Sequence, residues 1–457
     1  MTPPSIPPAA TGAPKQVGWR DRLAQLPVPE GTLSVAVGLL VSGTSAYLFL
    51  KLVHVGMGSD DAAGPVLQLW FLMFLLAPGF FLPGEQEVGR ALGHRRALGQ
   101  GGAPVVRRAA VLAGALAALT TVAILATSGV IVDKLFGGSW ALLLCLILGV
   151  LGWASAHLGR GVLSGSGRFR PYGVLLAADG VLRVIAATGL IIVGSKALVA
   201  YGLVATVPPA LALAIALRGQ RPIVEPGPEA SWPELTQNLG WLVLGSLMAA
   251  VLVNAGPLAA GLLKHTDQKA LVTHFTFAVV ITRIPLFMFQ AVQAALLPKL
   301  ARLAAQGEFA EFRAGFRKLM IIVGVVGVVG VAGALAVGPF AVRLFSAEAT
   351  LSRRTVGLLA LASALYMVAL AMAQAVIALH GHAKVAAGWA VGVAVFVIVT
   401  AIGSRSDLLL RVELGLVAGS IVADIAFAWA LASLLRTGAR PDAASVTEAL
   451  FDMPLEP

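Results

Sequence analysis

Charged side chains stand inside long apolar segments of this sequence, where each needs a chemical reason. Arg283 lies near the middle of the apolar segment 270–298, and Gln290 follows seven residues later on the same helical face. An ionised side chain at the centre of a bilayer costs about 2.5–3.5 kcal/mol on insertion scales. A guanidinium there either pairs with a carboxylate or carbonyl of its own protein, or binds a pyrophosphate through two parallel hydrogen bonds. Gln290 is then predicted to hydrogen-bond a sugar or phosphate.

Two carboxylates, Asp179 and Asp424, and one amide, Asn254, extend this set of candidates together with Arg183. Asp179 and Arg183 are four residues apart in one apolar segment, so they can pair on one helical face. The pair either lowers the cost of insertion, or Asp179 releases Arg183 to a substrate on protonation. Asp424 has no basic partner within one turn, which leaves a proton- or cation-coupling site or a partner on another helix. Asn254 either lines a cavity or bridges two helices.

Other chemistries have little support in the residues. The segment Gly194-Ser195-Lys196 has the wrong residue order for a phosphate-binding P-loop, and no nucleophile triad or acidic pair stands in a loop. Cys145 is the only cysteine, and His157 and His274 have no metal-type ligand one turn away. We therefore expect no enzyme, no cofactor and no metal site.

Twelve apolar segments must position these residues. The chain of 457 residues is 58% hydrophobic and 12% charged, and its mean hydropathy is +0.88. A membrane-spanning helix needs about 20 apolar residues, and such lengths recur along the whole chain. The predicted spans are 31–53, 62–84, 109–131, 139–162, 173–193, 197–217, 238–262, 270–298, 319–340, 355–380, 385–403 and 412–435.

The basic residues predict the orientation of these spans. With the N-terminus inside, the cytoplasmic segments carry roughly twice as many Lys and Arg as the outer loops, which favours cytoplasmic termini. The richest inner segments are 85–108 and 299–318. The net charge of +11 thus indicates contact with anionic membrane lipids, and we expect no nucleic-acid partner because no soluble basic domain is present.

A weak internal repeat divides the chain. The link Val162–Arg170 resembles Val376–Lys384, and Leu82-Pro83 resembles Leu297-Pro298 at the same interval to within one residue. An interval of six spans keeps the membrane orientation, so the repeat is parallel. We predict an all-α integral membrane protein of about twelve transmembrane helices, in two six-helix lobes around a central cavity. The predicted domains are a disordered cytoplasmic N-tail 1–30, an N-lobe 31–217, a cytoplasmic linker 218–237, a C-lobe 238–435 and a cytoplasmic C-tail 436–457.

Several motifs resemble one known family. They are the stretch 160–172 (RGVLSGSGRFRPY), Arg283-Ile284-Pro285, Leu297-Pro298-Lys299-Leu300 and Gly307-Glu308-Phe309. Together with the span count and the division into lobes, they resemble polysaccharide-type lipid flippases of the multidrug/oligosaccharidyl-lipid/polysaccharide exporter superfamily. The motifs are loose, so they specify the superfamily better than the substrate.

The resemblance implies alternating access in a bacterial cytoplasmic membrane. Its substrate would be a polyprenyl-pyrophosphate-linked oligosaccharide, moved from the inner to the outer leaflet, and its partner class would be glycan polymerases or glycosyltransferases. This chain is less similar to flippases of the peptidoglycan precursor (lipid II). Those proteins have several arginines in their first two helices, where this chain has only Lys51. Three alternatives stay open: a cation-coupled multidrug or small-molecule antiporter of the same superfamily, a lipid II flippase, and a non-transporting scaffold for envelope assembly.

Overall fold

The computed structural model describes residues 32–220, 224–237, 239–286, 289, 300, 302–304, 306–402 and 407–437. Every regular element among them is helical. The first half contains α2 (Thr32–Met57), α3 (Asp60–Ala97), α4 (Ala103–Ala126), α5 (Ser128–Val130), η1 (Ile131–Leu135), α6 (Trp140–Gly165), α7 (Phe169–Ile192), α8 (Leu198–Thr206) and α9 (Pro208–Leu217). The second contains α10 (Pro233–Thr236), α11 (Leu239–Leu263), η2 (Thr266–Gln268), α12 (Lys269–Thr282), α14 (Phe309–Arg343), α15 (Arg353–Ala378), α16 (His382–Ile402) and α17 (Leu408–Thr437).

The described residues form twelve helical segments that are long and apolar enough to cross a membrane. This confirms the predicted all-α class, the number of spans and a multi-pass membrane protein. We call the end of the bundle that holds Ala97, Gly165 and Thr437 the inner end, after the orientation predicted from charge, and the opposite end the outer end.

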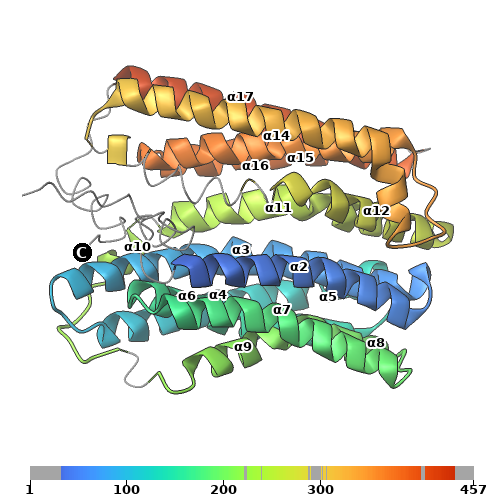
Figure 1. The fold of residues 1–457 in the computed structure, drawn as a ribbon, viewed down its shortest axis with the longest axis horizontal. Coiled ribbons are helices and arrows are strands. Elements are labelled where there is room, and N and C mark those ends of the chain that lie inside the picture. Colours follow the sequence, from blue (N-terminus) through green and yellow to red (C-terminus); the bar gives the residue numbers. More distant parts are fainter. Residues whose placement is uncertain are drawn as a thin grey trace, which may run out of the picture.

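The helices gather into two groups that lie side by side along the long axis of the bundle (Figure 1). One group contains α2–α9 and the other contains α11–α17, and we call them the N-lobe and the C-lobe. Packing partners recur between them: α2 packs along α7 and α11 along α16, while α7 contacts α9 and α16 contacts α17. These partners are equivalent under the six-span repeat, and the parallel symmetry itself stays a prediction.

Helices α3 and α11 lie at the boundary between the lobes and contact each other extensively (Figure 1). Pro78 inside α3 has no N–H, so the carbonyl of Phe74 loses its helical donor. Nδ2 of Asn254 on α11 donates to this carbonyl at 3.1 Å. Two further bonds run across the boundary, from Ser246 to the carbonyl of Pro78 at 2.9 Å and from Gln68 to the carbonyl of Pro257 at 3.1 Å. These three bonds, one of them to a carbonyl that Pro78 leaves without a helical donor, thus join the two lobes.

Several predicted boundaries were wrong. Residues 85–97, predicted as part of an inner loop, continue helix α3, and residues 309–318 begin α14. The polar residues there mark the end of the hydrocarbon layer, but a helix can continue into water where its side chains find partners. The predicted span 197–217 is broken after Thr206, because Pro208 cannot donate to the preceding turn.

The described part of the linker is fastened to the inner end of α3. Arg95 forms a two-point ion pair with Glu234 at 2.6 and 3.0 Å and donates to the carbonyl of Pro228 at 2.7 Å. Arg90 donates to the carbonyl of Glu234 at 2.8 Å. The linker therefore belongs to the N-lobe up to α10.

Glycine allows α2 and α7 to approach closely. A Cβ added at Gly173 would lie 2.3 Å from the carbonyl oxygen of Ser34, and one added at Gly38 would lie 2.5 Å from that of Gly173. No residue with a side chain fits at either position unless the backbones separate.

This contact gives a stability prediction. Gly173→Ala should lower stability by about 1–3 kcal/mol because it overpacks a backbone contact, measured as the midpoint of thermal unfolding of the purified protein. Gly189→Ala is the matched control on the same helix, since nothing lies within 4 Å of its added Cβ, and helix propensity favours alanine there. Equal midpoints for the two variants would contradict the close approach.

The charge asymmetry gives a topological prediction. After replacement of Cys145 by alanine, single cysteines at the exposed positions Gln100 and Gln306 should react with a membrane-impermeant maleimide only in permeabilised cells. A cysteine at Asp267, exposed at the outer end, should react in intact cells. Labelling of Gln100→Cys from outside would overturn the predicted orientation.

Candidate functional site

Two of the predicted binding residues meet at the boundary between the lobes. Arg283 follows the last residue of α12, and its Nη1 donates to Oδ1 of Asn254 at 3.3 Å. The same Asn254 donates to Phe74 of α3, so Arg283, Asn254 and the N-lobe are connected through one amide. Helix α12 ends here because Pro285 follows shortly afterwards and disfavours helical geometry before it.

Arg283 borders a pocket with polar groups of the C-lobe. The pocket is lined by Leu252, Val253, Val279, Thr282, Arg283, Leu359, Ala362, Ser363, Tyr366, Leu416 and Ser420. The guanidinium also stacks over the ring of Phe71 at 5.2 Å, which brings it against α3 of the other lobe. No carboxylate among the described residues forms an ion pair with it. Its charge is thus balanced only by an amide, aromatic faces and nearby hydroxyls.

Arg183 is held in the interior of the N-lobe. Its Nη1 donates to Oδ2 of Asp179 at 2.9 Å, and its Nη2 lies 2.7 Å from Oδ1. Both side chains are buried, and the guanidinium also lies 5.2 Å from the ring of Trp70 and 5.9 Å from that of Trp153. The pairing of Asp179 with Arg183 is confirmed.

The two arginines therefore lie at one depth but not in one pocket. Arg183 contacts Trp70 and Arg283 contacts the next residue of α3, Phe71. The expectation that both project into a shared cavity is not met in this conformation, because Asp179 and the aromatic rings enclose Arg183. Joint binding of one ligand by both arginines would require Arg183 to leave Asp179, and it stays a prediction.

The remaining candidates are less constrained. Asp424 lies half-buried on α17, and one of its carboxylate oxygens is buried without a hydrogen-bond partner in the described part of the chain. Its coupling role stays a prediction. Gln290 lies outside the described residues. Glu413, also on α17, is fully buried and 3.9 Å from Arg354 at the outer end, and the sequence analysis did not select it.

A buried polar cluster joins the lobes at the outer end. Asp60 of α3 contacts His54 of α2 at 3.2 Å, His274 of α12 at 2.8 Å and Ser346 after α14 at 3.0 Å. Nζ of Lys51 donates to the carbonyl of Phe345 at 2.8 Å. We call His54, Asp60, His274 and Ser346 the outer cluster. Its partners are far apart in sequence, so spacing alone carries no signal of it.

A second contact supports closure at the same end. Nζ of Lys264, directly after α11, donates to the carbonyls of Lys134 in the N-lobe and of Gly261. Burial lowers the pKa of Lys264 from its usual value, and the neighbouring Lys269 and Lys134 lower it further. The two lobes are therefore tied together at the outer end by charged groups.

Comparison with known proteins gives no match to a family model and none to a curated protein sequence. Solved structures match over nearly the full chain. An outward-facing conformation of a multidrug resistance MATE family transporter of the MOP superfamily has a TM-score of 0.66 at 15% identity, covering 89% of this chain and 96% of that one.

Two further structures give the same result. An inward-facing conformation of such a transporter has a TM-score of 0.64 at 14% identity, covering 88% of this chain and 99% of that one. The Vibrio cholerae MATE transporter VcmN in the bent form has a TM-score of 0.61 at 14% identity, covering 90% and 96%. The chain thus has the fold of MATE family transporters of the MOP superfamily, as the superfamily resemblance predicted.

The outer cluster gives a prediction about closure. Asp60→Asn removes the charge that holds two histidines and a serine, and charge-assisted hydrogen bonds contribute about 1.5–3 kcal/mol each. We expect outer opening to become about tenfold or more frequent. The measurement is the rate of maleimide labelling of Val280→Cys, whose backbone carbonyl accepts from Tyr47 across the lobes.

The matched control is Asp61→Asn, an exposed carboxylate next to Asp60. Both variants are made without Cys145 and compared at equal membrane levels. An unchanged labelling rate in Asp60→Asn would mean that the outer cluster does not hold the lobes together.

Proposed function

We propose that this protein is a transporter of the MOP-superfamily type that works by alternating access between its two lobes. The fold supports this proposal, because structures with this fold occur in inward-facing and outward-facing conformations. The lobe boundary supports it as well, because the polar contacts at the outer end and those between α3 and α11 at mid-depth are separate and can break independently. A non-transporting scaffold gives no reason for such separable contacts.

The proposed substrate is a polyprenyl-pyrophosphate-linked oligosaccharide of the cell envelope. The observation that carries this choice is Arg283, a half-buried guanidinium beside a pocket with no ion-paired carboxylate among the described residues. A pyrophosphate would supply the missing anion and accept two parallel hydrogen bonds. The hydroxyls of Ser363 and Ser420 are further donors for phosphate or sugar oxygens.

Release of the substrate requires this attraction to weaken in the outward-facing state. Protonation or cation binding at Asp424 is one proposed source, since its carboxylate has an unpartnered buried oxygen in the described part of the C-lobe. Exchange of Arg183 between Asp179 and the substrate is the other. Either event would act by shifting the equilibrium between two conformations of the lobes.

A cation-coupled multidrug or small-molecule antiporter is the second candidate. Two of the matching structures are of a multidrug resistance transporter, and this supports the antiporter at least as well as the flippase. An organic cation would be repelled by Arg283, so this candidate predicts binding elsewhere, near carboxylates such as Asp424. The two candidates thus differ in what the charge of Arg283 does.

Substitution of Arg283 distinguishes the flippase from the antiporter. In vesicles reconstituted with the purified protein, Arg283→Ala should slow translocation of a lipid-linked oligosaccharide by about ten- to a hundredfold, as expected for loss of a charged hydrogen-bond donor. The translocation rate of Arg283→Lys should be intermediate, because lysine keeps the charge but lacks the planar guanidinium that donates two parallel hydrogen bonds.

Arg313→Ala is the matched control, since Arg313 is an exposed arginine on α14. Wild-type rates of glycolipid translocation in Arg283→Ala would refute the anionic-substrate role. Proton-gradient-driven export of a cationic dye, unchanged or faster in Arg283→Ala, would favour the antiporter.

A further inference from the structure

A carboxylate, an imidazole and a phenol form a buried group in the inner half of the N-lobe, apart from Arg283 and from the outer cluster. Nδ1 of His157 on α6 lies 2.6 Å from Oε2 of Glu85 on α3. The hydroxyl of Tyr172 on α7 donates to Oε1 of the same carboxylate at 3.0 Å. Glu85 and His157 are 8% and 3% exposed, so water does not replace these partners.

The hydrogen bonds determine where a proton can be added. A carboxylate only accepts hydrogen bonds, so Nδ1 of His157 carries the hydrogen that faces Glu85. Nε2 of His157 is buried and has no hydrogen-bond partner among the described residues. It is therefore the basic atom of this group, and Glu85 stands in position to stabilise the imidazolium that forms when Nε2 is protonated.

The charges around the group are few and come from the three helices that hold it. Besides Glu85, the charges near His157 are Arg160 on α6 and Asp179 on α7, and these two have opposite signs. The guanidinium of Arg160 stacks over Trp153 at 5.2 Å. Glu87, also on α3, is neutralised by Arg90 at 2.8 Å. Among the residues that the structure describes, Glu85 is thus the one carboxylate paired with the imidazole.

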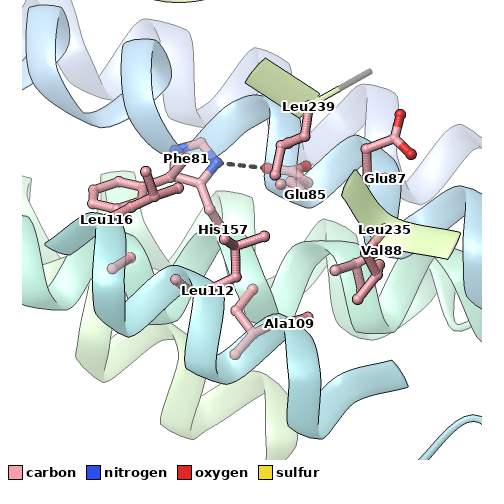
Figure 2. A pocket seen from close by; sticks show the side chains of 14 residues that line it. Phe81, Glu85, Glu87, Val88, Ala109, Leu112, Leu116, His157, Leu235 and Leu239 are labelled. Carbon is pink, nitrogen blue, oxygen red and sulfur yellow. Dashed lines mark hydrogen bonds and ion pairs between the residues drawn. The ribbon is translucent and has the colours of Figure 1, made fainter. Parts of the chain in front are cut away.

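His157 and Glu85 line a pocket that reaches the other lobe (Figure 2). The walls contributed by α4, α10 and α11 are apolar: Ala109, Leu112, Ala113, Leu116, Leu235 and Leu239. In Figure 2 the carboxylate of Glu87 points away from His157. Leu239 is the first residue of α11, so part of the wall belongs to the helix that contacts α3 along the lobe boundary.

We propose that the Glu85–His157 pair is a proton-binding site whose occupancy favours opening of the inner end. The proton adds to the lone pair of Nε2, and the positive charge is balanced by the Glu85 carboxylate. The new N–H then stands at a pocket whose walls are mostly apolar, where an unpaired charged donor is costly. Water must enter to accept its hydrogen bond, and it enters where α11 separates from α3.

This step couples transport to a proton gradient only if the protein transports, so that part of the inference rests on the proposed function. Proton binding itself does not. The site differs from Asp424 and Asp179 because it has a pocket, an unpartnered basic atom and a paired carboxylate together.

Trp153 allows the proton to be observed directly. Its ring lies 5.5 Å from that of His157, and a protonated imidazole quenches a neighbouring indole. In the full-length protein in lipid nanodiscs, the fluorescence that is lost in Trp153→Phe should fall as the pH is lowered from about 9 to about 5, with a single-proton profile. His157→Gln should abolish this titration.

Glu85→Gln should move its midpoint down by about one to three pH units, because the imidazolium loses its opposite charge. His265→Gln, an exposed histidine at the outer end, is the control and should titrate as the wild type does. A signal that does not titrate in this range, or that persists in His157→Gln, would overturn the site. An unshifted midpoint in Glu85→Gln would overturn the role of the carboxylate.

A second measurement tests the link to opening. A cysteine at Leu239, in a protein without Cys145, should react faster with a maleimide at low pH than at high pH, and His157→Gln should remove the difference. Equal rates at both pH values would show that protonation does not open the inner end. If vesicles move no substrate in any condition, the proposed function fails, while the fluorescence titration still decides whether the proton site exists.

Discussion

Within hydrocarbon, a polar group without a partner costs several kcal/mol, and this constraint explains where the polar side chains of the chain lie. Helix α3 shows it most clearly. Its internal prolines deprive carbonyls of their helical donors, and Asn254 of α11 satisfies the carbonyl of Phe74. The bond that satisfies this carbonyl of α3 is therefore also one of the bonds that hold the lobes together. Because a partner on another helix can be withdrawn as a whole, such repairs allow lobes to separate without unfolding either helix.

The sequence was sufficient for features that depend on local composition. Twelve apolar stretches of sufficient length require twelve spans, and the pairing of Asp179 with Arg183 follows from four-residue spacing on one helix. Helix ends were less predictable. The charges of residues 85–97 predict the end of the apolar layer, but the helix continues because Arg90 and Arg95 find partners in the linker.

Partners distant in sequence could not be predicted. Asp60 and His274, or Glu85 and His157, are paired only by the way their helices pack. The neighbours of His157 and His274 at helical spacing predict no metal site, and they give no sign of the carboxylates that contact these histidines. For the same reason the sequence placed Arg183 and Arg283 in one cavity: it showed a similar depth, but it did not show that α3 stands between them.

The attachment of the linker determines which residues move with each lobe. Arg95 binds Glu234 and the carbonyl of Pro228, so the chain is held against α3 up to α10. Helix α11 begins at Leu239 and packs with the C-lobe helices α16 and α17 as well as with α3. A change in the angle between the lobes would therefore move Leu239 relative to Leu235, because Leu235 stays with the N-lobe. Both residues line the pocket of His157. Such a change would deform that pocket, which makes the Glu85–His157 pair sensitive to lobe position whatever substrate the central pocket binds.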